Sequence, residues 1–313
     1  MAKARGIMAE LNVEERSFVR KQRIFNALNQ FAWAIQRPAS DGQYIALCGG
    51  DTGLMARHYG TVQAMNNFFN MFGSPIVGAL SDTLGRRQLL ALGRCGWVCW
   101  FMAIPHFTSL RQRMLGELVC WSVLSTGNWV IYGAQNTDLF GDRPTLSARI
   151  AAVDQAVGFT SYAVGALVAE ALHQLGVGGR GSNAAPYTFY IAALCNIYSV
   201  LLPLSNRETL RKENRRPFEL KRANPLSNVL LLLRNGPGLR GLTYACTLFF
   251  GCNGCWSTMV PFRMGVLGWS AVDISRMSAF VTPFGALTSN FFVSPFLKKV
   301  GNRYEKALRP FAS

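Results

Sequence analysis

The chain has 313 residues, of which half are apolar or aromatic and only 15% are charged, and it carries a formal net charge of +16. Soluble proteins average about 25% charged residues, so this composition argues against an ordinary soluble enzyme and favours a membrane protein. The excess of basic residues is also compatible with a nucleic-acid partner. The positions of Lys and Arg along the chain therefore have to decide between the two classes.

Eight segments are predicted to cross a bilayer, which takes a helix of about 20 mostly apolar residues. The first segment, 24–48, is degenerate, because Arg37, Pro38 and Asp41 lie in its middle. Four segments are apolar, with their charged residues (Arg94, Glu117, Asp154 and Glu170) expected near a helix end: 58–80, 88–105, 114–134 and 150–172. Three segments have no charged residue: 187–205, 241–262 and 277–297. Core helices of a soluble protein are the alternative, which so many segments in series disfavour.

The distribution of basic residues supports the first crossing. When segment 24–48 is counted as inserted, one membrane face receives the basic segments 3–23, 86–87, 207–222 and 298–309. The loops of the opposite face contain only a few arginines: 106–113, 173–186 and 263–276. Because Lys and Arg mark the cytoplasmic face, both ends are predicted to be cytoplasmic. Charge divided among several loops also argues against a nucleic-acid partner, which leaves the lipid bilayer as the predicted environment.

The segment GALSDTLGRR, residues 78–87, falls between the second and third crossings and is predicted to be a short cytoplasmic loop. Gly78 and Gly85 are expected to let the helix end and the backbone reverse, since glycine adopts left-handed conformations or close helix contacts at little cost. Arg86 and Arg87 would lie at the membrane surface, where they can pair with Asp82 or with helix C-terminal carbonyls.

This segment resembles the signature of the major facilitator superfamily (MFS), G-x-L-[A/S]-D-x-x-G-[R/K]-[R/K]. The matching residues are Gly78, Leu80, Ser81, Asp82, Gly85, Arg86 and Arg87. Residues 58–80, the ETL at 208–210 and the segment 215–226 are similar to the drug-efflux and tetracycline-resistance-like branch. The resemblance implies an all-α bundle of two six-helix halves that moves a small solute by alternating access, with the segment of Gly78, Asp82, Gly85, Arg86 and Arg87 as the gating loop.

The same resemblance gives a domain organisation. Residues 1–23 are expected to be a cytoplasmic N-terminal segment and 24–205 the first six-helix half, with a degenerate first helix. Residues 206–238 are expected to be a cytoplasmic linker, and 239–313 a partial second half of two helices. The chain ends after the eighth crossing, so helices nine to twelve of the family are expected to be absent.

Polar side chains within the crossings are the candidates for solute binding. On the second crossing, Gln63, Asn66, Asn67, Asn70 and Ser74 recur at helical spacing on one face. Amides are costly against lipid, so this face is expected to line a solute cavity or to hydrogen-bond a neighbouring helix, two readings that stay equally open. Weaker candidates of the same kind are Asn128 and Asn253.

Energy coupling and catalysis receive less support. The efflux members of the family have an arginine in the fourth helix that is linked to proton coupling. In the corresponding segment 111–122, the part predicted to lie inside the crossing contains Glu117 and no arginine. A coupling proton therefore remains open. No phosphate-binding loop, metal-ligand spacing or catalytic group is recognisable, so no cofactor, no metal and no enzymatic activity are predicted. The alternative to a transporter is a non-transporting membrane protein or an incomplete fragment that acts, if at all, by assembly with a partner.

Overall fold

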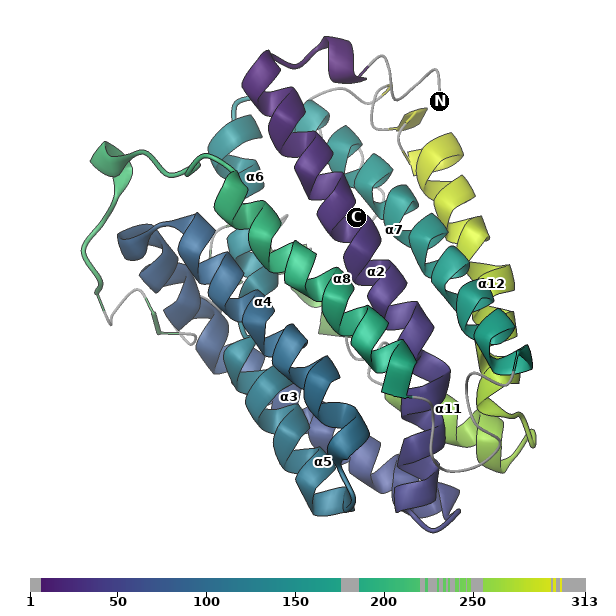
Figure 1. The fold of residues 1–313 in the computed structure, drawn as a ribbon. Coiled ribbons are helices and arrows are strands. Elements are labelled where there is room, and N and C mark those ends of the chain that lie inside the picture. The colour runs from purple at the N-terminus through teal and green to yellow at the C-terminus, as the bar shows by residue number, and fades with distance from the viewer. Residues whose placement is uncertain are drawn as a thin grey trace.

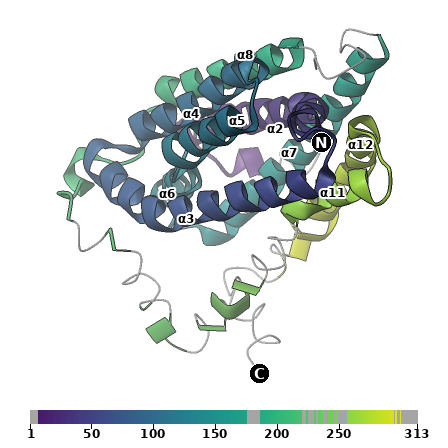
Figure 2. The same cartoon turned by 90° about the horizontal axis from the view of Figure 1, so that it is seen from below.

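The computed structural model describes residues 7–175, 186–219 and 256–293, together with isolated positions between 223 and 299. Every regular element within this described part is helical. Long helices lie side by side in a bundle (Figure 1). α4 (Arg86–Ala103) and α8 (Pro186–Ser205) lie next to each other, and α2 (Val13–Leu47), α7 (Pro144–Gln174) and α12 (Ala271–Thr288) form a neighbouring layer. The view from below shows the same grouping, with α3 (Thr52–Leu84) and α11 (Trp256–Gly265) closing one side (Figure 2).

The degenerate first crossing is a continuous helix. α2 runs over Val13–Leu47, begins with a capping box between Asn12 and Glu15, and continues through Pro38. Arg37 and Asp41, which hydropathy alone would exclude from a bilayer, form an i,i+4 ion pair of 2.9 Å inside the bundle. Pairing each charge with its neighbour removes much of the cost of placing it there.

The segment 78–87 is not the loop that was predicted. α3 spans Thr52–Leu84 and α4 spans Arg86–Ala103, so Gly85 alone, with φ of 110°, separates the two helices. Gly78 lies within α3, and the helix continues because nothing after Pro75 interrupts its backbone hydrogen bonds. The Gly85 N–H still donates to the Ser81 carbonyl, at 3.1 Å. The expectation for Gly85 fits the structure, and the expectation that Gly78 ends the helix is wrong.

The fourth crossing is broken rather than continuous. It consists of α5 (Leu110–Gly116), the π-helical turn η2 (Glu117–Leu124) and α6 (Asn128–Phe140). Gly127 has φ of 75°, and a Cβ at this position would lie 2.7 Å from Val77 of α3. A left-handed backbone in close contact with a neighbouring helix therefore ends one helix and starts the next.

The remaining helices complete the bundle. The 3-10 turn η1 (Ile104–His106) ends α4, and α7 (Pro144–Gln174) and α8 (Pro186–Ser205) follow. Beyond a 3-10 turn at Lys212–Asn214 lie α11 (Trp256–Gly265), α12 (Ala271–Thr288) and the π-helical η4 (Ser289–Val293). α12 packs against α7 and α2. In the described part, α7 and α8 are the two helices that are long and apolar enough to cross a membrane by hydropathy alone.

Candidate functional site

The junction between α3 and α4 is held by Arg86. Its Nη1 contacts the Asp82 carboxylate at 2.6 Å and also donates to the Ser81 hydroxyl. Its Nε donates to Asp138 of α6 at 3.3 Å, and Thr209, in the segment after α8, donates to the same Asp138 oxygen at 3.0 Å. One guanidinium, only 8% exposed, thus ties the ends of three helices together.

Glu208 completes this junction and was missed as a site residue. Its two carboxylate oxygens accept from the backbone N–H groups of Arg86 and Arg87, at 3.0 and 3.1 Å. The N-cap residue of α4 is Gly85, which has no side chain to do this, so Glu208 supplies both the acceptor and the negative charge that a helix N-terminus favours. A Cβ on Gly85 would lie 2.6 Å from the Glu208 carboxylate. We call Asp82, Arg86, Asp138 and Glu208 the junction cluster. The sequence signal for Glu208 was the ETL triplet at 208–210, which was interpreted only as a resemblance to the efflux branch.

The segment after α8 also touches α3 directly. The Arg216 N–H donates to the Asp82 carbonyl at 3.2 Å, and the Thr83 hydroxyl donates to the Arg216 carbonyl at 2.9 Å. Arg87, the remaining member of the predicted gate, donates through its guanidinium to the Asn206 carbonyl at 3.3 Å. The end of α3 and the start of α4 are therefore bound to the linker by backbone as well as by charged contacts.

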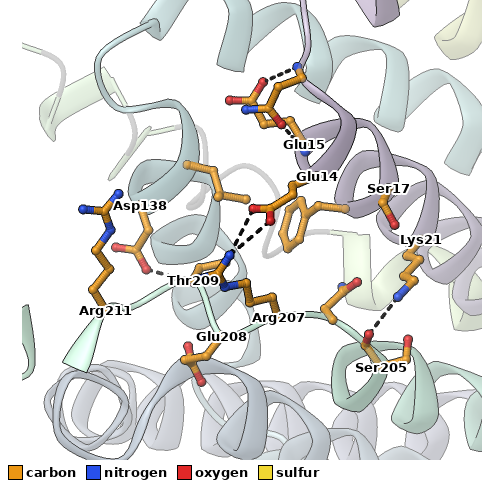
Figure 3. A pocket seen from close by; sticks show the side chains of 14 residues that line it. Glu14, Glu15, Ser17, Lys21, Asp138, Ser205, Arg207, Glu208, Thr209 and Arg211 are labelled. Atoms are coloured by element: carbon orange, nitrogen blue, oxygen red, sulfur yellow. Dashed lines mark hydrogen bonds and ion pairs between the residues drawn. The ribbon is translucent and has the colours of Figure 1, made fainter.

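A cavity of about 500 Å³ lies beside the junction cluster (Figure 3). The start of α2, the end of α6, residues 205–209 and Arg211 line it, and its acidic groups have partners. Glu14 pairs with Arg207 at 3.1 Å. Glu15 pairs with Arg143, and this hydrogen bond raises the pKa of the Arg143 guanidinium. These carboxylates already pair with arginines. The cavity is therefore a strongly polar gap between the start of α2, the end of α6 and the segment after α8.

The amide stripe on α3 lies on one face as predicted, but its members bond along their own helix. Gln63 donates to Asn67 at 3.1 Å, and Asn70 donates to the Asn66 side chain at 3.0 Å. Asn66 is buried, Gln63 and Asn70 are half-buried, and Asn67 is exposed.

Of the other two amide candidates, the structure describes Asn128 alone. Asn128, on α6, is 3% exposed and packs against Gly93 of α4, and neither of its amide atoms has a hydrogen-bond partner in the described part of the chain. Asn253 lies outside the described residues.

A second charged group lies inside the bundle. The Asp41 carboxylate accepts from Arg37 Nε at 2.9 Å and from the Tyr59 hydroxyl of α3 at 2.7 Å. Its side chain is 1% exposed, whereas that of Arg37 is 31% exposed. We call Arg37 and Asp41 the central pair. The local sequence indicates only that both residues oppose insertion, and it does not reveal a site because the Tyr59 hydroxyl that completes it comes from another helix.

The fourth crossing does contain an arginine, contrary to expectation. α5 begins at Leu110, so Arg113 is part of the broken helix, where it is 1% exposed. It donates to Gln43 at 2.6 Å and to the Ser40 hydroxyl at 2.6 Å, and it faces Glu117 at 3.6 Å.

Three of the four charges expected to reach the membrane interface remain inside the bundle: Arg94, Glu117 and Asp154 are each less than 5% exposed. Asp154 pairs with Arg23 at 2.9 Å. Arg94 donates to Asn29 at 3.2 Å and lies 4.1 Å from the ring centre of Phe25. Glu170 is the exception, because it pairs with the half-exposed Arg276 at 2.7 Å.

Comparison with known proteins identifies the family. The profile of the Major Facilitator Superfamily matches residues 24–312. The chain belongs to this family. The class C tetracycline resistance protein of Escherichia coli is 26% identical over 258 residues, which are 80% of this chain and 60% of that protein. The class B protein is 26% identical over 150 residues, 47% of this chain and 34% of that protein.

A solved structure shares the fold. The human organic anion transporter MFSD10 (TETRAN) superposes with a TM-score of 0.64 at 18% identity, over 90% of this chain and 73% of that one. The chain spans less than two thirds of the length of the curated relatives it matches. Family and fold confirm the predicted resemblance, the all-α MFS bundle and an integral multi-pass membrane protein that is not an enzyme.

Proposed function

We propose that this protein carries a small solute across a membrane by alternating access, with the junction cluster as its gate. The observation that carries this proposal is the shared guanidinium of Arg86, which joins Asp82 of α3 to Asp138 of α6 while Glu208 holds the start of α4. Packed helices held by such a network have discrete arrangements, because separating them requires several charged contacts to break together. A cluster of this kind is therefore suited to hold one state of a carrier.

Direction and coupling are finer parts of the proposal. The names of the two tetracycline resistance proteins support export. The central pair and the pair of Arg113 and Glu117 support a coupling proton, because a carboxylate inside a membrane bundle that gains a proton releases its arginine partner. Neither part requires a nucleotide or a metal.

The test compares Asp82→Asn with Asp142→Asn. Asp142 is a matched control because its carboxylate, 77% exposed, contacts Arg143 at 3.6 Å and takes no part in the junction cluster. Accumulation of tetracycline and of fluorescein is measured in cells that express each variant. Asp82→Asn should abolish transport while the protein stays in the membrane fraction, and Asp142→Asn should transport like the parent.

Equal transport by Asp82→Asn and the parent would contradict the gate. Absence of transport by the parent with both probes would instead favour the alternative, a non-transporting membrane protein that works through a partner.

A further inference from the structure

Arg37 has hydrogen-bond donors that nothing in the described part of the chain uses. Its Nε donates to Asp41 at 2.9 Å, but no described residue accepts from Nη1 or Nη2. The side chain is nevertheless 31% exposed. We propose that Arg37 binds the acidic group of the solute, so that the substrates of this carrier are small organic anions. This inference rests on the proposed transport function and adds to it the chemical class of the cargo.

The predicted bounds of the first crossing place Arg37 near the middle of the bilayer. Arg37 is 13 residues after the start of the predicted crossing 24–48 and 11 before its end, or about 20 Å and about 16 Å along a helix. A guanidinium at this depth is strongly disfavoured against lipid. Its exposed fraction therefore faces a water-filled space between helices, which is where carriers with repeated halves place their substrate.

The surroundings of Arg37 come from both sides of the linker. Tyr59 of α3 and Tyr162 of α7 lie close enough to Arg37 to interact with its charge. Tyr162 in turn packs beside Ala279 of α12, a helix that follows the linker and packs against α2 and α7 (Figures 1 and 2). A solute at Arg37 would thus touch elements that move relative to one another during alternating access.

The accessible charge is positive rather than negative. Both oxygens of Asp41 are occupied, by Arg37 and Tyr59, and the side chain is 1% exposed, so the acid lies behind the arginine. The outer edge of a guanidinium presents two parallel N–H groups, a geometry that matches a carboxylate or sulfonate and repels a cation. Arg94 and Arg113 are 2% and 1% exposed, so neither offers a comparable edge.

The experiment measures binding to the purified full chain in detergent by fluorescence polarisation. The probes are fluorescein, an anion, and rhodamine 123, a cation built on the same tricyclic ring system. The parent should bind fluorescein more tightly than rhodamine 123. Arg37→Gln should weaken fluorescein binding about 10-fold or more, because a bidentate charged contact is lost, and should leave rhodamine binding unchanged.

Two further variants keep the test decisive. Asp41→Asn should bind fluorescein as tightly as the parent or more tightly, because it removes the negative charge behind Arg37. If Arg37→Gln fails to fold because Asp41 is left unpaired, the double variant Arg37→Gln/Asp41→Asn removes both charges and should still lose the preference for the anion. A purely structural ion pair predicts instead that Arg37→Gln and Asp41→Asn impair the protein alike.

Preference of the parent for rhodamine 123, or parent-like fluorescein binding by Arg37→Gln or by the double variant, would overturn the proposal. Binding is read without transport, so the two proposals fail separately. If the parent binds fluorescein through Arg37 but transports neither tetracycline nor fluorescein, the result counts against the transport function alone. Parent-like transport of fluorescein by Arg37→Gln would instead count against Arg37 as the residue that binds the cargo.

Discussion

The junction cluster and the central pair both place an arginine beside a carboxylate, but they use the arginine differently. Arg86 is 8% exposed and its donors face Asp82, Asp138 and Ser81. Arg37 donates one N–H to Asp41, its side chain is 31% exposed, and no described residue accepts from its Nη1 or Nη2. A charge whose donors are used by the protein fixes geometry, whereas a charge with spare donors is available to a ligand. Variants of the first kind should therefore change stability and gating, and variants of the second kind should change selectivity.

Glu208→Ala is expected to have the largest effect on stability. It removes two charge-assisted hydrogen bonds from the start of α4, at 3.0 and 3.1 Å, and should lower the free energy of unfolding by about 2–3 kcal/mol. Thermal unfolding in detergent, followed by tryptophan fluorescence, measures this. Glu213→Ala is the control, because Glu213 is exposed in the same linker. The variant should keep the preference of the parent for fluorescein. A loss of that preference, or an equal loss of stability in Glu213→Ala, would erase the distinction between the two regions.

Gly85→Ala tests the backbone of the junction. Gly85 has φ of 110°, and a new Cβ would meet the Glu208 carboxylate at 2.6 Å, so we expect a loss of about 2 kcal/mol from strain and displaced capping. Gly50 is a matched control, with φ of 86° and no atom within 4 Å of the point where a Cβ would lie, so that Gly50→Ala should cost only about 1 kcal/mol. The same thermal unfolding assay compares them. If Gly85→Ala and Gly50→Ala lower the free energy of unfolding equally, the contact with Glu208 does not contribute to the cost of the Gly85 substitution.

Arg94→Met tests whether the exposed fraction of an arginine, rather than its position inside the bundle, determines whether that arginine binds a ligand. Arg94 is 2% exposed and has no acidic partner in the described part of the chain. Relief of its desolvation should offset the lost contacts with Asn29 and Phe25, so the stability should stay within about 1 kcal/mol of the parent. Fluorescein and rhodamine binding should be unchanged. A loss of anion preference equal to that of Arg37→Gln would show that exposure is the wrong criterion.

The sequence predicted the helices better than their ends and interruptions. Alternation of basic loops identified the first crossing despite Arg37, Pro38 and Asp41, because the charge rule depends on loops and not on the helix itself. The sequence did not predict the break at Gly127. The left-handed backbone there accompanies a close contact with Val77 on another helix. The signature located Asp82 and Arg86, but it assigned a loop where the backbone stays helical up to Leu84.

Site residues that depend on distant partners were the hardest to predict. Arg37 and Asp41 have the i,i+4 spacing of a helical ion pair, yet their surroundings come from Tyr59 and Tyr162 on other helices. Glu208 lies 122 positions after Arg86 in the chain. No pattern in the sequence around Glu208 predicts that this residue caps α4. Sequence periodicity reports the face of a helix, but not which helix it meets.

The smallest effect is expected at Asp273, whose charge faces water before the predicted crossing 277–297. The Ser270 hydroxyl and N–H donate to its carboxylate at 2.6 and 2.9 Å, and these bonds lower the pKa of Asp273 below its ordinary value. Because the folded pKa is the lower one, the stabilising contribution is present above the ordinary carboxylate range and is lost as the pH falls through the folded value. Hydrogen exchange at the first turn of α12 should therefore show increased fraying as the pH falls below about 4, the ordinary pKa of an aspartate. Asp273→Asn should remove this pH dependence, and Asp142→Asn should retain it. Neither variant should alter anion binding, because a solvated charge at a helix end neither ties helices together nor faces the space beside Arg37. An altered preference for fluorescein in Asp273→Asn would mean that charges outside the bundle also set selectivity.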